Sequence, residues 1–156
     1  MNFKMYFLLS VVGVAIFINC SSQLNQLEKK VGEIHENCDK PDSCLFILKN
    51  CVDFEWDTVC FIEGVDNPEF VKQFINADYK GYKEGTEPII FKKNGQVIYY
   101  ENNIYDIESN KRGSISVSDS MFNNAYIYTP KTAVFRIEKV ETSNGVFYIL
   151  HHLNVE

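Results

Sequence analysis

Five cysteines are the residues of this chain whose type and spacing could do chemistry: Cys20, Cys38, Cys44, Cys51 and Cys60. The last four are separated by five, six and eight residues in turn. Structural zinc sites bring their thiolates in closer pairs, with about two to four residues between them, so this spacing argues against zinc. An even set of four cysteines in an exported chain instead indicates two disulfides.

The pairing of these four cysteines stays open at the level of the sequence, because four cysteines allow three connectivities. Cys44 and Cys51 are seven residues apart. On a helix they would share a face and would be poorly placed to bond each other. We favour Cys38–Cys44 together with Cys51–Cys60.

The histidines, serines and carboxylates form no recognisable catalytic arrangement. His151 and His152 are adjacent, and neighbouring side chains of a strand point to opposite faces, so they cannot chelate one metal ion together. Four alternating serines have no Gly-x-Ser-x-Gly frame and no evident base. They are Ser114, Ser116, Ser118 and Ser120. Asp106 and Glu108 lie in a polar stretch, where carboxylates are usually solvated. We expect no catalytic residue, no metal ligand, no small-molecule cofactor and no enzymatic activity.

The N-terminal stretch from Met1 to Ser22 has the layout of a secretory signal. It opens with a basic residue, Lys4, continues through an apolar block from Met5 to Ile18, and closes on small residues. Disulfides persist outside the cytoplasm, so the signal and the cysteine set support each other. We therefore expect a location in the cell envelope.

The end of this signal, residues 17–22, reads Phe-Ile-Asn-Cys-Ser-Ser and resembles the signal of bacterial lipoproteins, in which the cysteine becomes the lipidated N-terminus. It departs from that pattern at Asn19, where a smaller residue is usual. Two alternatives remain: cleavage after Ser22, which gives a secreted or periplasmic chain, and retention as an uncleaved anchor, for which the apolar run is short. We predict a signal peptide over residues 1–19 and a single domain over residues 20–156. Lipid on Cys20 would anchor it in the outer membrane, facing the periplasm.

Composition and charge bound what this domain can be. Hydrophobic residues make up 46% of the chain and aromatic residues 14%, which is enough for one packed core. The formal net charge is −6, and it includes Lys4 of the signal. Such a chain is unsuited to neutralising phosphates, which argues against a nucleic-acid partner and against electrostatic adhesion to anionic lipid. A basic protein partner is compatible with this charge.

Apolar periodicity predicts a helix over residues 23–37. Its stripe consists of Leu24, Leu27, Val31, Ile34 and Cys38. A short buried helix is expected over Cys44–Asn50, with a strand as the alternative, because short apolar runs are ambiguous. A further helix starts at Asp66 or Asn67 as N-cap, with Pro68 in its first position.

The remaining segments predict strands. Trp56–Ile62 is rich in β-branched and aromatic residues. Asn94-Gly95 between apolar runs is a strong hairpin signal, and a second hairpin joins 132–141 to 146–153. Shorter strands are expected over 114–117 and 125–128. The predicted fold class is α+β: an antiparallel sheet of about five or six strands in series, with two or three helices on one side.

Residues 53–57 read Asp-Phe-Glu-Trp-Asp and lead into a predicted strand. This block resembles a group of small, mostly uncharacterised bacterial exported proteins and lipoproteins, over roughly residues 45–153. The resemblance implies an α+β envelope domain and transfers no catalytic residue. From the residues themselves, we expect Trp56 to pack in the core and Asp57 to accept hydrogen bonds from backbone N–H groups or from the indole.

These observations predict a non-enzymatic lipoprotein of the cell envelope that binds another protein. The alternative is a periplasmic immunity protein or an inhibitor of a secreted toxin or enzyme, because an acidic surface would steer a basic target. A third class, a hydrolase with dispersed residues, would be recognised by a perturbed histidine or carboxylate in a pocket. The candidate protein-binding side chains are aromatic. They are Trp56, Tyr99, Tyr100 and Tyr126.

Overall fold

The fold is given by a computed structural model, which describes residues 26–40, 43–64, 67–104, 115–118, 125–143 and 145–154. Within these ranges the chain forms eight strands and two α-helices, so the α+β prediction is confirmed. The predicted signal from Met1 to Ser22, with Cys20, lies outside the described residues. The same holds for Asp106 and Glu108.

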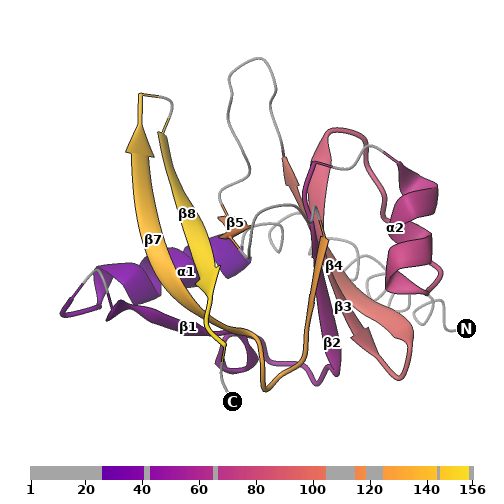
Figure 1. Cartoon of the computed structure of the whole chain (residues 1–156), viewed down its shortest axis with the longest axis horizontal. Coiled ribbons are helices and arrows are strands. Elements are labelled where there is room, and N and C mark those ends of the chain that lie inside the picture. Colours follow the sequence, from indigo (N-terminus) through magenta and orange to yellow (C-terminus); the bar gives the residue numbers. More distant parts are fainter. Residues whose placement is uncertain are drawn as a thin grey trace, which may run out of the picture.

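The strands form two four-stranded sheets that share one core (Figure 1). Sheet A has the order β1-β7-β8-β5, with the bounds Leu45–Ile47, Val134–Thr142, Gly145–His152 and Ile115–Ser118. Sheet B has the order β4-β3-β2-β6, with the bounds Gln96–Ile104, Thr86–Lys93, Thr58–Ile62 and Ala125–Tyr128. The helices are α1, Gln26–Glu36, and α2, Pro68–Ile75.

The prediction of one antiparallel sheet with five or six strands was wrong. The chain passes between the two sheets several times, and β5 runs parallel to β8, whereas the other pairs are antiparallel. Alternation along a strand shows which side chains are buried, but it does not show which sheet the strand joins. The number of sheets was therefore beyond what the pattern could predict.

An apolar core lies between the two sheets. Sheet A contributes Phe46, Phe135, Ile137 and Leu150, and sheet B contributes Val59, Phe61, Ile89 and Phe91. The rings of Tyr128 and Phe135 meet edge to face with their centroids 5.1 Å apart, which is a preferred aromatic geometry. This core holds the two sheets together.

A smaller cluster lies on the other face of sheet B, beneath α2. Cys60, Ile62 and Ile90 of the sheet pack with Val71 and Ile75 of the helix. In Figure 1, α2 lies on the flank of sheet B that faces away from sheet A. Sheet B is therefore covered on both faces.

Helix α2 begins at the N-cap that the sequence predicts, and a lysine of β3 contacts its C-terminal end. The Asn67 side chain accepts from the backbone N–H groups of Glu69 and Phe70. At the other end, Lys92 Nζ donates to the carbonyl of Ile75 at 2.5 Å. A cation at the C-terminus of a helix is stabilised by the helix dipole, so Lys92 fixes α2 to β3.

The Asp53–Asp57 segment braces the β3–β4 hairpin. The hairpin turn is Asn94-Gly95, with φ angles of 53° and 76°, as the sequence predicts. The Asp57 carboxylate accepts the backbone N–H of Asn94 at 2.5 Å. The Trp56 ring meets Phe91 edge-on, with the centroids 5.5 Å apart. Trp56 and Asp57 therefore have the structural roles that we expected.

The stretch Cys44–Asn50, expected as a short helix, forms strand β1 and a 3-10 turn over Leu48–Asn50. Phe46 is buried, whereas Leu45 and Ile47 are exposed, which is the alternation of a strand. The helix prediction was wrong because pairing with β7 decides the conformation of a short apolar run.

Candidate functional site

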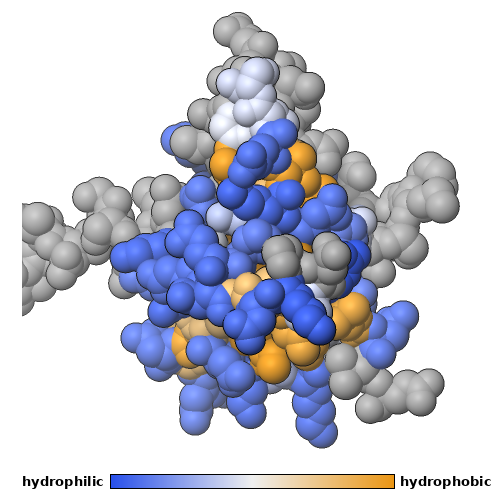
Figure 2. Space-filling model, turned by 90° about the vertical axis from the view of Figure 1, so that its left-hand side faces the viewer, coloured by the Kyte–Doolittle hydropathy of each residue, from blue (hydrophilic) through white to orange (hydrophobic). Residues whose placement is uncertain are grey.

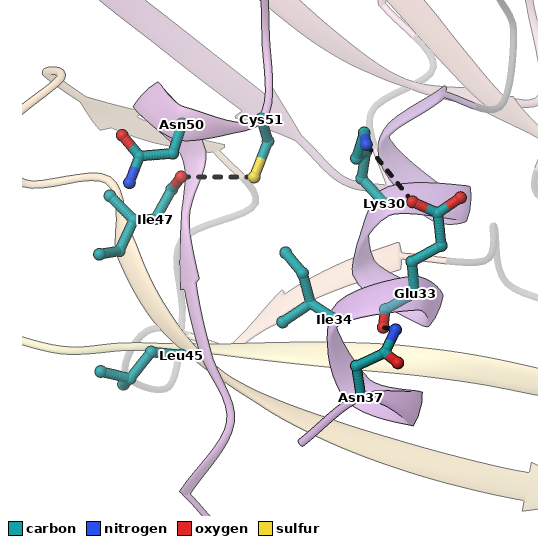
Figure 3. A pocket seen from close by; sticks show the side chains of 8 residues that line it. All are labelled: Lys30, Glu33, Ile34, Asn37, Leu45, Ile47, Asn50 and Cys51. Atoms are coloured by element: carbon teal, nitrogen blue, oxygen red, sulfur yellow. Dashed lines mark hydrogen bonds and ion pairs between the residues drawn. The ribbon is translucent and has the colours of Figure 1, made fainter.

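A groove of about 410 Å³ lies between helix α1 and the edge strand β1 (Figure 3). One wall consists of Lys30, Glu33 and Ile34 of α1 with Asn37 just after the helix, and the other of Leu45, Ile47, Asn50 and Cys51 of β1 and the turn after it. In Figure 3 the Ile34 side chain points into the gap between the helix and the strand. A polypeptide segment in this groove would contact both walls.

Helix α1 is seated by its apolar stripe and by one buried carboxylate. Leu27 and Val31 are buried, as their spacing predicts. A Cβ atom added at Gly32 would lie 3.0 Å from the Tyr148 hydroxyl of β8, so helix and strand are in close contact. The backbone N–H of Leu27 donates to Glu101 of β4, at the helix end that favours negative charge. The α1 wall is thus fixed to both sheets.

A disulfide joins Cys38 and Cys44, the residues next to Asn37 and Leu45 of the lining. It joins a residue just after α1 to the residue before β1, with 5.8 Å between the two Cα atoms. This is the pairing that we favoured from the sequence. The bridge ties the ends of the two walls together and so limits how far they can move apart.

The free edge of β1 directs backbone groups into the groove. The Leu48 N–H donates to the Ala133 carbonyl, and this bond shows which residues of β1 direct their backbone groups toward β7. Bonded residues alternate in an antiparallel pair, so Leu45 and Ile47 direct their N–H and C=O groups away from β7. β1 therefore offers hydrogen-bonding groups on the side that faces α1.

The charged groups of the lining neutralise each other. Lys30 Nζ lies 3.3 Å from the Glu33 carboxylate, and Lys29 Nζ lies 3.9 Å from it. The Asn37 side chain donates back to the carbonyl of Glu33 and is held against its own helix. The centre of the groove thus favours an apolar or uncharged occupant.

The thiol of Cys51 lies at the β1 side of the groove and donates to the Ile47 carbonyl at 3.4 Å. Burial raises the pKa of this thiol, and the charge of Lys30 opposes that effect. A thiol with a raised pKa stays protonated near neutral pH and is a poor nucleophile. Cys51 is therefore a lining residue, held by a weak hydrogen bond that a ligand could displace.

The second expected disulfide, Cys51–Cys60, does not form, and both residues are free thiols. Cys60 belongs to the cluster beneath α2, whereas Cys51 packs against the core between the sheets. Sheet B separates these two environments. Burial raises the pKa of Cys60 to about 11, as for an inert core thiol. The spacing of the cysteines could not show on which face of a strand each would lie.

Apolar surface surrounds the groove. Leu45 is 53% exposed and Ile47 is 37% exposed. Figure 2, which views the molecule from the side of α1, β1 and β7, shows apolar patches within a mostly hydrophilic face. Large apolar side chains next to an open strand edge are typical of a surface that a partner covers.

A second polar cluster lies inside the fold, between β4 and α1. Glu101 is 2% exposed and accepts from the Tyr99 hydroxyl at 2.7 Å. Burial raises the pKa of Glu101, and the bonds from Tyr99 and from the backbone of Leu27 oppose that rise. Glu87 and Asn103, which face each other across β3 and β4, are also buried. The contacts of Glu101 are those of an anchor for α1.

The four aromatic residues proposed as binding anchors are dispersed. Trp56 is buried, and Tyr99 and Tyr126 are half-buried against the core between the sheets. Tyr100 is 43% exposed, and its ring centroid lies 5.3 Å from that of Tyr79. The lining of the groove includes none of the four.

The two histidines lie on opposite faces of β8, as expected. His151 Nε2 lies 2.5 Å from the Glu138 carboxylate. His152 packs its ring 4.6 Å from that of Tyr128 and forms a hydrogen bond with the carbonyl of Thr132. Both histidines are therefore half-buried.

In the part of the chain that the structure describes, no group of three or more His, Cys, Asp or Glu side chains could hold a metal ion. Nor is any helix of that part long and apolar enough to cross a membrane. No protein-family model, curated protein or solved structure matches the chain. The groove is therefore interpreted from its own geometry.

Sequence reasoning missed the two residues that matter most at this site, Leu45 and Ile47. The run from Cys44 to Leu48 is apolar at every position, so no alternation shows which side chains are exposed. Ile34 was recognised as part of the apolar stripe of its helix. The sequence did not show that this end of the stripe borders a groove.

Proposed function

We propose that this chain is a non-enzymatic protein-binding domain of a bacterial cell envelope and that the groove between α1 and β1 is its binding surface. The supporting observation is that an open strand edge, exposed apolar side chains and a covalent brace occur in one place. Removing apolar surface from water is favourable by about 25 cal/mol per Å², and binding retains the part of this that exceeds the entropic cost of association. These features favour a partner and require no reacting group.

A photo-crosslinking amino acid tests this surface in the native host. We expect a discrete protein adduct from position Leu45 or Ile47. We expect none from Val146 or Ile127, which are comparably exposed apolar residues elsewhere on the molecule. Adducts from Tyr100 alone would favour the alternative role, an immunity protein or inhibitor that binds through exposed aromatic residues. No adduct at Leu45 and Ile47, or equal adducts everywhere, would contradict the proposal.

The location in the envelope is part of the same proposal. It is supported by the signal-like stretch before Cys20 and by the disulfide Cys38–Cys44. The intact mass of the protein from the membrane fraction should show acyl chains on Cys20. Reduction should add two hydrogens, because the described cysteines form one bridge. A chain without lipid in the soluble fraction would contradict the tether.

A further inference from the structure

We infer that the occupant of the groove is an extended peptide segment of the partner, which adds to sheet A as a strand beside β1 and carries uncharged residues at its centre. This inference rests on the proposed function, because it specifies how the partner is held at the same surface. Three observations lead to it: the outward backbone groups of β1, the position of the groove relative to the sheet edges, and the pairing of the charges in the lining.

The outward backbone groups of β1 favour an extended segment as the occupant. The N–H groups of Leu45 and Ile47 point into the groove, because the alternate residues of β1 bond to β7. An α-helix satisfies its own backbone groups and could not use this edge. An extended segment has the complementary donors and acceptors, and its addition to an exposed edge is a common mode of peptide recognition.

The position of the groove selects β1 among the edge strands. The sheets end at β1 and β5 and at β4 and β6, and the lining includes residues of β1 alone among these four. At β5 the edge is already used, because the Val117 N–H donates at 2.6 Å to Glu63, the residue that follows β2 of sheet B. A strand added at β1 would instead enter a prepared space, with Ile34 on its far side.

The charges of the lining indicate which kind of residue the segment carries at its centre. Lys30 and Glu33 pair with each other, with side chains that are 52% and 46% exposed, so they leave no unpaired charge to attract a charged residue of the segment. An apolar residue between the helix and the strand would lie against Ile34 and shield it from water. The occupant therefore places an apolar or small uncharged residue between the helix and the strand.

Selection from a random dodecapeptide library against the oxidised domain tests this inference. We expect enriched peptides whose binding is lost in Ile34→Lys and retained in Ile127→Lys, which alters an exposed apolar residue on the edge strand β6. N-methylation of successive peptide residues should weaken binding about tenfold or more at every second position and leave the positions between unchanged, because only alternate N–H groups face β1.

Alkylation of thiols provides a second measurement on the unaltered domain, in case Ile34→Lys fails to fold. Cys51 lines the groove, so a bound peptide should protect it, whereas the fully buried Cys60 should be unreactive with or without peptide. Failure to enrich any peptide, or peptides that leave Cys51 unprotected, would overturn both the proposed function and the inference. Protection of Cys51 without alternation in the N-methyl series would overturn only the addition of a strand.

Discussion

The two edge strands of sheet A differ in what their outward backbone groups contact. At β5 the outward Val117 N–H and the Ser116 hydroxyl both donate to the Glu63 carboxylate, at 2.6 and 3.0 Å. At β1 the outward groups of Leu45 and Ile47 face a groove, and the side chains of these residues are exposed. The β5 edge is thus closed by the carboxylate of the residue that follows β2, whereas the β1 edge is left open beside a helix.

This difference shows that the open edge is not a general feature of the fold. Exposed strand edges invite pairing with other chains, and proteins usually block them. A short strand limits that risk, and β1 has three residues. Because α1 restricts access from one side and the disulfide Cys38–Cys44 holds it there, β1 is open only to a segment that fits the groove.

The largest expected effect comes from removing the brace at the open edge. Reduction of Cys38–Cys44, or the double change Cys38→Ala and Cys44→Ala, should lower the free energy of unfolding by about 2 kcal/mol, because so short a loop then regains its freedom in the unfolded chain. Chemical denaturation with and without reductant measures this. Cys51→Ala is the control and should keep the dependence on reductant. Equal stability in both conditions would show that the bridge does not constrain α1.

Opening the closed edge should have the next largest effect. Glu63→Ala removes the acceptor of the Val117 N–H and the Ser116 hydroxyl, and the loss of a typical hydrogen bond at a site that water can reach costs about 1 kcal/mol. Thermal and urea denaturation would register the loss, with the exposed Glu84→Ala as control. If both variants were equally stable, Glu63 would not be what closes the β5 edge.

Glu101, which anchors α1, should make the stability of the domain depend on pH. The pKa of Glu101 is raised in the folded state by burial, so the folded protein binds this proton more tightly than the unfolded chain does. The contribution of Glu101 to the free energy of unfolding should therefore increase as the pH falls through the raised pKa, and level off below its ordinary value of 4.5.

Glu101→Gln should remove this part of the pH dependence. The difference in free energy of unfolding between wild type and variant, measured from pH 7 to pH 4, isolates it from the other carboxylates. As the pH falls, the free energy of unfolding of the wild type should increase relative to that of the variant. The opposite slope would mean that the ionised carboxylate is favoured by the bonds from Leu27 and Tyr99 more than it is disfavoured by burial.

The smallest effect on stability is expected from the open edge itself. Leu45→Lys and Ile47→Lys alter side chains that are already exposed, so the free energy of unfolding should change by no more than about 0.5 kcal/mol. Both changes should nevertheless weaken binding of a partner at the groove. A large loss of stability in either variant would show that these side chains serve the fold and not a partner.

Much of the fold could be predicted from local chemistry. Asn94-Gly95 selects a hairpin because both residues adopt positive φ, and Asn67-Pro68 selects a helix start, and both are found. The apolar stripe of α1 was predicted in the same way, as was the Asp57 side chain as an acceptor of a backbone N–H. Each depends on neighbours in the sequence, which is why the pattern was sufficient.

The candidate site could not be predicted, because it depends on pairing between distant segments. The exposure of Leu45 and Ile47 follows from the register of β1 with β7, and no local alternation indicates it. The free state of Cys51 and Cys60 likewise depends on which side of sheet B each thiol lies. Tyr99 was chosen as a contact residue, yet its ring is half-buried and its hydroxyl bonds Glu101.

Amide hydrogen exchange of the free domain tests the contrast between the two edges most directly. The amides of Leu45 and Ile47 should exchange rapidly, because they point into the groove, whereas the Val117 amide should be protected by Glu63. The Phe46 amide, which faces β7 in the same strand, provides the internal reference. Protection of Leu45 and Ile47 to the level of Phe46 would contradict the account, because the β1 edge would then already be occupied.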